Sequence, residues 1–433
     1  MVPALFGAFM ILFLLVFKNH WHLRSLLFAA LLISISPIMV FFSRFYIQEM
    51  LLAFFTLGFM ASLWQSLKTQ KPAWFLTAGF CAGFMFATKE TSIIIFGSLI
   101  GSLLILKIFF PPESQNKNFL RPLLSYNILY FLGAGFLLWL FFFSSFFHHI
   151  NGLWDSIRTF GIYFQRTGGD GVHAHPWYYY LKMLSFSQYG SGPVWSEALV
   201  VAAALMGGVF GFTTKVKSRK EAAFIRFVMF YALIATVVFS LIPYKTPWNI
   251  IPFHLGMLIL AGSGISFVLD MFPKMRLKFP VLVIIILGIF HLGWQSWRAS
   301  FKYYADPRNP YVYAHTSTDF LNLVQRTKDI AGIHPEHKHM LIKVIAEPHE
   351  MWPLPWYLRD FEKVGYWTET SEAGKIQGTP IIISSVEQTQ NLFPMIKDQY
   401  LSEYYGLRHE VLLSIHIRLD LWNEFLKKQA INQ

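Results

Sequence analysis

Residues 123–147 read LLSYNILYFLGAGFLLWLFFFSSFF, 25 residues without a charged side chain. A helix needs roughly 20 mostly apolar residues to cross the hydrocarbon core of a bilayer. Lipid offers no partners to backbone N–H and C=O groups, so a chain is expected to cross it as helices. Similar apolar runs occupy residues 26–40, 93–108 and 280–290. These stretches predict an integral, multi-pass membrane protein.

The composition of the whole chain supports this prediction. Of its 433 residues, 55% are hydrophobic and 14% are charged, whereas soluble domains average about 45–50% apolar and about 25% charged residues. The net charge of +12 would suit nucleic acid only if the basic residues clustered on one soluble face. They are spread over short loops, so we expect no nucleic-acid partner. The single cysteine, Cys81, excludes an intrachain disulfide.

The fold class predicted is an all-α polytopic membrane domain of about ten transmembrane helices, followed by a small α/β extracytoplasmic domain. The boundary is placed between residues 298 and 299. In residues 299–433, the pattern predicts helices at 319–330 and 386–397 and buried strands at 340–345 and 381–384. The apolar windows of residues 1–298 lie at 2–17, 25–42, 48–66, 73–88, 91–108, 123–147, 193–212, 224–242, 249–269 and 280–297.

Basic residues are distributed unequally between alternate loops, and this asymmetry sets the orientation of membrane proteins. The set expected to be cytoplasmic holds fifteen: Lys18, Arg24, Lys68, Lys71, Lys107, Lys117, Arg121, Lys215, Lys217, Arg219, Lys220, Arg226, Lys274, Arg276 and Lys278. The other set holds six: Arg44, Lys89, Arg158, Arg166, Lys182 and Lys245. We therefore expect residues 299–433 on the outer face of the plasma (inner) membrane, with the lipid bilayer as a partner.

The longest loop between predicted spans, residues 148–192, lies on the outer face in this topology. It is rich in Trp, Tyr, His and Gly, and we expect it to carry a short amphipathic helix on the membrane surface. The same parity places Met1 outside without a charged flank that would fix its direction. This favours the hypothesis that a preceding span is missing.

Three short outer segments concentrate the charged residues near the membrane, where an ionisable group is a functional candidate by default. Residues 43–49 (SRFYIQE) hold Arg44 and Glu49, one helical turn apart if the turn is helical. They would form either a structural ion pair or, with Arg44 on a phosphate, a site with Glu49 on a metal or acceptor hydroxyl. Residues 88–91 (TKET) hold Lys89 and Glu90, with Lys89 either binding an anionic head group or snorkelling.

The third segment, residues 243–248 (PYKTPW), is a proline-fixed turn that presents Lys245 and Trp248, or a simple loop with an interfacial tryptophan. In the long loop, Arg158 and Arg166 lie eight residues apart and would share one helix face. They would guide a lipid phosphate or remain solvated charges. His173 and His175 are candidates for a divalent metal ion, although no ordered zinc motif accompanies them.

Five strings in order resemble the GT-C class of membrane glycosyltransferases, which includes protein O-mannosyltransferases and the aminoarabinose transferases of lipid A. The resemblance is closest to the flippase-activity-associated proteins of archaeal N-glycosylation clusters. It covers nearly the whole chain and rests on SRFY to Glu49 (43–49), ATKE (87–90), YKTPW (244–248), NPYVYAHTS (309–317) and WPLPWYLRD (352–360).

The resemblance implies a polyprenyl-phosphate sugar donor and transfer to an unknown acceptor at the outer face. Class members carry an acidic catalytic loop before a segment similar to residues 2–7 (VPALFG). We expect that loop to be absent here, so Glu49 or Glu90 would have to act as the base. The implied roles are donor-phosphate binding by Arg44, Lys89, Lys245, Arg158 and Arg166, and an acceptor side formed by Trp248, Trp356, Tyr357 and Arg359.

Two other classes of function are weighed against this one. A non-catalytic polyprenyl-lipid binder, or a flippase-associated component of a glycan assembly pathway, would need the basic residues but no base. A secondary transporter would show inverted repeats and polar residues at mid-membrane, and the sequence shows neither clearly.

Overall fold

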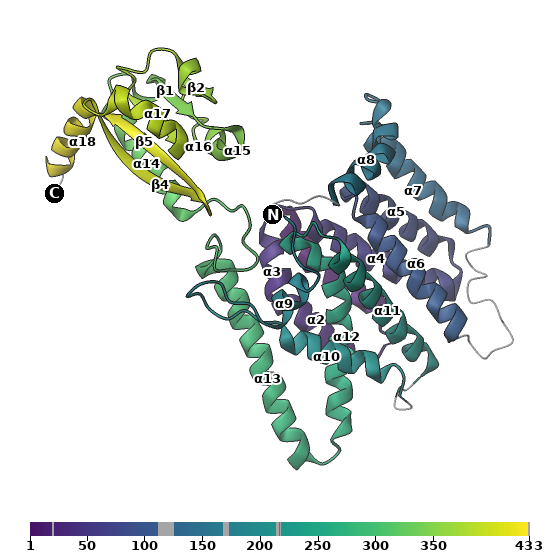
Figure 1. Ribbon diagram of the computed structural model, residues 1–433. Helices are drawn as coiled ribbons and strands as arrows, with labels where there is room; N and C mark the ends of the chain where they lie inside the picture. The colour runs from purple at the N-terminus through teal and green to yellow at the C-terminus, as the bar shows by residue number, and fades with distance from the viewer. Residues whose placement is uncertain (20, 111–124, 168–172, 214–215, 217, 432–433) are drawn as a thin grey trace. The chain divides into compact units, whose positions relative to one another are not determined.

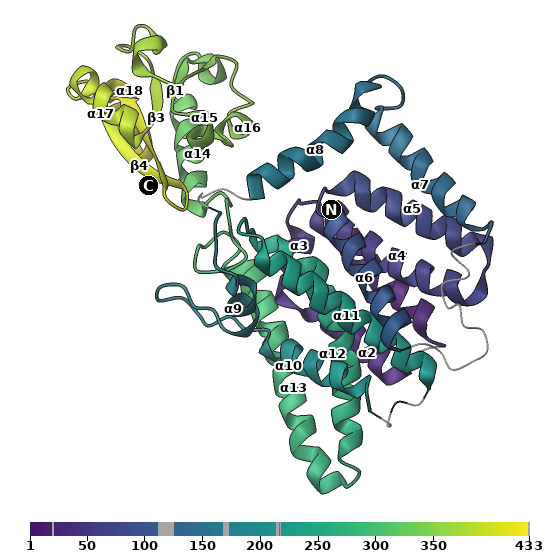
Figure 2. The ribbon, with the colours of Figure 1, turned by 45° about the vertical axis from the view of Figure 1, so that its right-hand side comes forward.

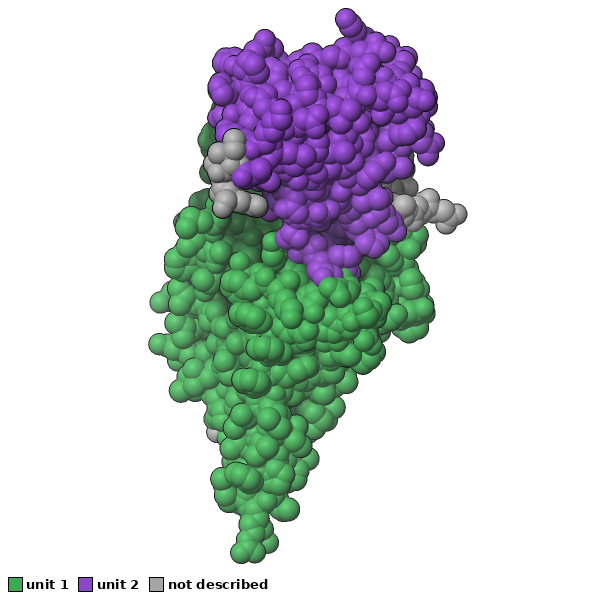
Figure 3. Space-filling model, turned by 90° about the vertical axis from the view of Figure 1, so that its left-hand side faces the viewer, with its two compact units in different colours: residues 1–304, 308–311 green, residues 305–307, 312–433 purple. Residues whose placement is uncertain are grey.

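The computed structural model describes residues 1–19, 21–110, 125–167, 173–213, 216 and 218–431, without the side chains of 163–167 and 431. The chain forms two compact units, coloured separately in Figure 3. Unit 1 comprises Met1–Tyr304 with Arg308–Tyr311, and unit 2 comprises Ala305–Pro307 with Val312–Gln433. Four basic residues of the predicted cytoplasmic set, Lys117, Arg121, Lys215 and Lys217, lie outside the described residues, as does the start of the window at 123–147.

Unit 1 is built from helices (Figure 1). Its elements are α1 (Val2–Met10), η1 (Ile11–Phe17), α2 (Leu23–Ile35), α3 (Pro37–Arg44), α4 (Glu49–Thr69), α5 (Pro72–Thr88), α6 (Ser92–Phe109), α7 (Ile128–Phe143), α8 (Asn151–Thr167), α9 (Tyr179–Ser185), α10 (Ala198–Phe210), α11 (Arg219–Leu241), η3 (Pro247–Ile250), α12 (Ile251–Met271), α13 (Met275–Trp297) and η4 (Arg298–Lys302).

Five of the described helical segments are long and apolar enough to cross a membrane, or six when the bent pair α2 and α3 is taken as one span. Four further apolar helices of 10–17 residues coincide with the remaining predicted windows: Val2–Phe17, Pro72–Thr88, Ile128–Phe143 and Ala198–Phe210. The helical, apolar character predicted for this part of the chain is therefore confirmed, and the crossing of the membrane by all ten windows stays a prediction. The predicted amphipathic helix of the long loop is present as α8.

The helices approach closely where glycines face each other. Figures 1 and 2 show α10 beside α12, and a Cβ on Gly264 of α12 would lie 1.8 Å from the Ala203 carbonyl oxygen of α10. From the opposite side, a Cβ on Gly207 would lie 2.1 Å from the Leu260 carbonyl oxygen. Lipid supplies little hydrophobic force between helices, so small residues that permit close van der Waals contact hold them together.

One predicted span, residues 25–42, is broken in the structure. Helices α2 and α3 meet at Ser36 with a bend of 51°. Pro37 explains the break, because proline has no N–H to continue the α2 ladder but fits the first turn of a new helix. Ser36 caps α3, with its Oγ accepting from the Met39 N–H at 3.4 Å.

Unit 2 is a five-stranded sheet with helices on both faces. The strand order is β2-β1-β3-β5-β4; β2, β1 and β3 are parallel, and β5 pairs antiparallel with β3 and β4. The strands are β1 (Ile342–Ile345), β2 (Val364–Trp367), β3 (Ile381–Ser385), β4 (Tyr400–Arg408) and β5 (Val411–Arg418). The helices are α14 (Thr318–Ala331), α15 (Pro348–Met351), α16 (Leu354–Tyr357), α17 (Val386–Ile396) and α18 (Leu419–Ile431).

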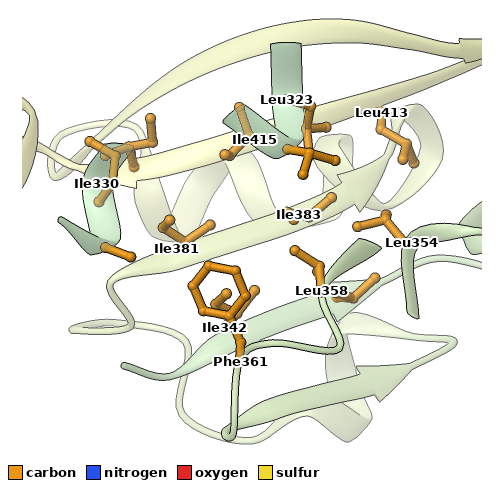
Figure 4. Close-up of a cluster of buried hydrophobic side chains, with 14 of the residues drawn as sticks. Leu323, Ile330, Ile342, Leu354, Leu358, Phe361, Ile381, Ile383, Leu413 and Ile415 are labelled. Atoms are coloured by element: carbon orange, nitrogen blue, oxygen red, sulfur yellow. The ribbon is translucent and has the colours of Figure 1, made fainter. Parts of the chain in front are cut away.

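The core of unit 2 follows the alternation of side chains along β3. Ile381 and Ile383 point into the larger cluster, which Figure 4 shows between the sheet and residues such as Leu323 of α14 and Leu354 of α16. Ile382 points to the opposite face, where it packs with α17. Every residue of β1 and β3 is buried because these strands are covered on both faces. The two helices and two strands predicted here are confirmed, whereas β2, β4 and β5 were not predicted.

Candidate functional site

Three polar side chains from separate helices of unit 1 meet around one ammonium group. Lys89 Nζ forms an ion pair with Glu49 Oε1 and donates to Asn249 Oδ1 at 3.1 Å. The Glu49 side chain is 3% exposed and that of Lys89 is 16% exposed. We call these three residues the Lys89 cluster.

Local structure explains how each member of the Lys89 cluster is placed. Glu49 begins α4, where the helix dipole favours a carboxylate. Lys89 directly follows α5, and its backbone is extended rather than helical. Asn249 lies in the short helix η3, which Pro247 initiates directly before α12.

The Lys89 cluster has spare hydrogen-bonding capacity. An ammonium group has three N–H donors, and the described acceptors of Lys89 are Glu49 and Asn249. Glu49 Oε2 is buried with no hydrogen-bond partner among the described residues. The arrangement therefore offers one donor for an anionic oxygen and one carboxylate oxygen able to accept a proton.

Arg44 lies at the end of α3 and does not pair with Glu49, although the sequence allowed that pair. Its Nη1 donates to the Ser300 carbonyl oxygen at 2.7 Å, and its guanidinium lies 4.1 Å from the centroid of the Phe301 ring. The side chain is exposed. Glu49 follows five residues later, so the Cα atoms of the two residues are at most about 18 Å apart. Arg44 therefore lies at the same end of unit 1 as the Lys89 cluster.

Lys245 is placed differently from Lys89. Its side chain is 1% exposed, and its Nζ donates to the carbonyl oxygens of Ile242 and, at 3.0 Å, His175. Its own amide donates to the His173 carbonyl at 2.9 Å, beside a bridge between Ala174 and Tyr244. Burial lowers the pKa of Lys245. Lys245 thus fastens the long loop to the end of α11.

The two histidines predicted as metal ligands are packed against tyrosines. The His173 ring meets Tyr244 edge-on with centroids 4.9 Å apart, and the His175 ring stacks on Tyr179 at 4.2 Å. Burial, with Lys245 and His173 nearby, lowers the pKa of His175. Within the described part of the chain, no group of three or more His, Cys, Asp or Glu side chains could hold a metal ion. The divalent metal stays a prediction.

The remaining predicted residues of unit 1 lie on three different segments. Glu90 is half-buried next to Lys89, and Trp248 is half-buried beside Asn249. Arg158 is exposed on α8 with its guanidinium 5.6 Å from the centroid of the Trp154 ring. Arg166 belongs to α8, but its side chain lies outside the described residues.

The predicted acceptor residues of unit 2 form a small surface group on and after α16. Trp356 is 60% exposed, and the Arg359 guanidinium lies 4.3 Å from the centroid of its ring. Tyr357 packs inward against Phe320, with ring centroids 5.1 Å apart. Trp356 and Arg359 are therefore available to a ligand, and Tyr357 belongs to the edge of the core.

A cavity of about 720 Å³ lies among α4, α5, α6, α7 and α8. Its lining is almost wholly apolar and includes Phe59, Phe86, Phe96, Phe136, Trp139 and Ile157. Its size is that of a typical small-molecule site, but it lacks the convergent polar groups that orient a polar ligand. Phe86 lies in the last turn of α5, three residues before Lys89. An apolar chain is the ligand that such a cavity suits.

Several polar residues of unit 1 that form buried clusters were not predicted from the sequence. Asn249 follows the YKTPW string directly, and a polar residue at the start of a predicted span was the available signal. Ser36, Glu197 and His254 form a fully buried network. Glu197 was the signal here, as an acidic residue inside the apolar window at 193–212.

The fold and these polar clusters define the protein as an integral membrane protein with an ArnT-like fold. The comparison is with ArnT from Cupriavidus metallidurans bound to undecaprenyl phosphate, at a TM-score of 0.57 and 15% sequence identity over 96% of this chain and 82% of that one. The apo state of the same protein gives a TM-score of 0.52 and 14% sequence identity, again over 96% of this chain and 82% of that one. The likeness supports the GT-C resemblance at the level of the fold. No protein-family model matches the chain, and no curated protein matches it.

Proposed function

We propose that this protein is a membrane glycosyltransferase that moves a sugar from a polyprenyl-phosphate donor to an acceptor at the outer face of the membrane. The observation that carries the proposal is the Lys89 cluster, whose lysine follows three residues after Phe86 in the lining of a large apolar cavity. A polyprenyl phosphate joins a long apolar chain to an anionic head group. The cavity suits the apolar chain, and Lys89, at the end of α5, suits the head group.

The cavity among α4 to α8 would hold part of the isoprenoid chain, and Lys89 would donate its third N–H to the phosphate. Arg44 would add a charge-assisted donor from the end of α3. During transfer, the bond between the anomeric carbon and the phosphate oxygen breaks, and its electron pair leaves with the phosphate. Lys89 and Arg44 stabilise the charge that develops there.

The acceptor hydroxyl oxygen bonds to the anomeric carbon and loses its proton to a carboxylate. Glu49 Oε2 is buried without a described partner, and Glu90 stands beside Lys89, so these two are the candidate bases. The exposed Trp356 and Arg359 of unit 2 would contact the acceptor, since a tryptophan face and a guanidinium suit a glycan.

The topology belongs to the same proposal. The ten apolar segments would all cross the inner membrane, with residues 299–433 outside. Lys18 and Lys274, on the predicted cytoplasmic side, and Lys182 and Tyr404, on the predicted outer side, are exposed positions for single cysteines in a Cys81→Ala background. A membrane-impermeant maleimide added to intact cells should label only the second pair.

A non-catalytic polyprenyl-lipid binding component is the second candidate. The ion pair favours it, because the Glu49 carboxylate is already engaged by Lys89. Both candidates bind the lipid phosphate, and only the first transfers a sugar.

The decisive experiment uses the purified full chain in nanodiscs with a radiolabelled polyprenyl-phosphate hexose. Binding and release of the hexose to candidate acceptors are measured for wild type, for Glu49→Gln and for Glu49→Gln combined with Lys89→Met. The two variants differ only in the ammonium group, so its loss should weaken binding about tenfold or more, as one charged hydrogen bond is worth roughly 1.5–3 kcal/mol.

The exposed Lys182 supplies the control, and Lys182→Met should bind as wild type does. Equal donor affinity in Glu49→Gln with and without Lys89 would contradict the proposed site. Tight binding without transfer to any acceptor would establish the second candidate instead.

A further inference from the structure

A buried carboxylate lies where three helices of unit 1 meet. Glu197 Oε1 accepts from Ser36 Oγ and from the Ile38 N–H, both at 3.0 Å, and Glu197 Oε2 lies 2.9 Å from His254 Nε2. The side chains of Ser36, Glu197 and His254 are 0% exposed. A buried carboxylate is tolerated only when its lone pairs are satisfied, and here both oxygens have partners.

Glu197 and its three partners belong to three different parts of unit 1. Glu197 occupies the N-cap position of α10 without a side-chain capping bond, Ser36 and Ile38 flank the break between α2 and α3, and His254 lies near the start of α12. Pro37 leaves the α3 N-terminus with free amide donors, and Glu197 accepts one of them from Ile38. The 51° bend is therefore held by a side chain outside the bent pair.

The ends of these elements carry the candidate donor site. Helix α3 ends at Arg44, and Asn249 of the Lys89 cluster stands five residues before His254. Because Glu197 joins the start of α3 to α12, it fixes the direction in which α3 runs relative to the Lys89 cluster.

We propose that Glu197 is a positioning residue: it locks the break between α2 and α3 and thereby holds Arg44 in register with Lys89. The functional half of this proposal rests on the proposed donor site, whereas the structural half does not. Releasing Glu197 lets the bend relax. A change of about 20° in the direction of α3, which is roughly 12 Å long, moves its far end by about 4 Å.

A distance measurement tests the structural half without any ligand. Spin labels are placed on Tyr46→Cys, just beyond α3, and on Met271→Cys, at the far end of α12, in a Cys81→Ala background. Tyr46 is 82% exposed and Met271 is 41% exposed, so both accept a label. The parent should give one narrow distance distribution. Glu197→Ala should broaden or shift it by about 4 Å, since the α3 end is released.

Two further variants separate positioning from general stability. Glu197→Gln keeps an oxygen that accepts from Ile38 and Ser36, so it should restore the narrow distribution. Glu221 is a matched control because it is 4% exposed and also accepts a backbone amide, that of His22, at the opposite end of α2. Glu221→Ala should lower thermal stability and leave the labelled distance unchanged.

Undecaprenyl phosphate binding, measured in the unlabelled chain, tests the functional half. Glu197→Ala should weaken it on the order of tenfold or more, since a displaced Arg44 would lose its charge-assisted hydrogen bond to the phosphate, and Glu197→Gln should recover most of the affinity. A distance distribution in Glu197→Ala identical to the parent would overturn the proposal. Failure of the wild type to bind would count against the donor site alone, because the distances are still measured.

Discussion

Removing Lys89 should destabilise unit 1 by leaving a charge stranded inside it. The substitution Lys89→Met keeps an apolar stem of similar length and deletes the ammonium. Glu49 would then be a carboxylate with 3% exposure whose ion-pair partner is gone. A side chain that loses its partner in this way must be protonated, draw in water or distort its surroundings.

The size of the effect follows from the burial of the pair. Breaking a buried ion pair by removing one partner costs about 3–5 kcal/mol. Lys89 retains 16% exposure, which places this pair near 3 kcal/mol. For a unit of this size, each kcal/mol shifts the unfolding midpoint by roughly 2 °C, so the midpoint should fall by about 6 °C.

A double-mutant cycle isolates the pair. Glu49→Gln combined with Lys89→Met leaves two neutral side chains, and its midpoint should lie within about 2 °C of wild type, because replacing a whole buried pair is close to neutral. Thermal unfolding in detergent, followed by intrinsic tryptophan fluorescence, compares the four proteins. If Lys89→Met is no less stable than the double variant, the stranded-charge explanation is wrong.

Two other predictions concern packing and titration. Gly264→Ala should destabilise unit 1 by about 1–3 kcal/mol, because its Cβ would lie 1.8 Å from the Ala203 carbonyl oxygen, whereas Gly97→Ala, where no atom lies within 4 Å, should cost nothing in the same melt. Burial lowers the pKa of His416 to about 4. The unfolded chain, with a pKa near 6.5, takes up that proton first, so stability should fall as pH drops from about 6.5 to 4, by up to about 3 kcal/mol. His416→Gln should flatten this part of the pH profile, and an unchanged profile would contradict the assignment.

The helices of unit 1 could be predicted from the sequence because a chain that crosses lipid must satisfy its own backbone hydrogen bonds. Each apolar window had to be helical, and each coincides with an apolar helix. The break at Ser36 was not predicted, although Pro37 stood in the middle of the window at 25–42. Proline within an apolar run is compatible with a kink or with two helices, and only the contacts of Glu197 settle which one forms.

In unit 2, strands β1 and β3 were predicted from the sequence and strands β4 and β5 were not, for a different physical reason. Strands β1 and β3 are buried on both faces and read as continuous apolar runs. Strands β4 and β5 form a hairpin with many polar side chains, such as Ser402 and His416, which bond to each other across the pair. Their stability depends on pairing across the hairpin and with β3, and the mixture of polar and apolar residues along β4 does not form a continuous apolar run.

The candidate site shows where prediction from spacing ends. Sequence order placed Arg44 one turn from Glu49, yet the carboxylate pairs with Lys89, which is 40 residues away in the chain. A helix that ends between Arg44 and Glu49 separates them, and the α4–α5 hairpin brings Lys89 back to the start of α4. Motif strings identified the charged residues, and the tertiary fold decided the partners.

The buried ionisable groups of unit 1 can be ranked by the hydrogen-bonding capacity that the described residues leave unused. Glu197 has partners at both oxygens, so it is suited to hold structure. Lys245 gives two donors to backbone carbonyls of neighbouring segments and is 1% exposed, which suits a fastening role. Lys89 retains a third donor, partial exposure and a carboxylate partner with one oxygen unpaired. An incoming phosphate adds a partner to Lys89 without breaking a tertiary contact, whereas at Glu197 it would have to displace one, and Lys245 is too deeply buried for a phosphate to reach its third N–H. That difference in cost places ligand chemistry at Lys89.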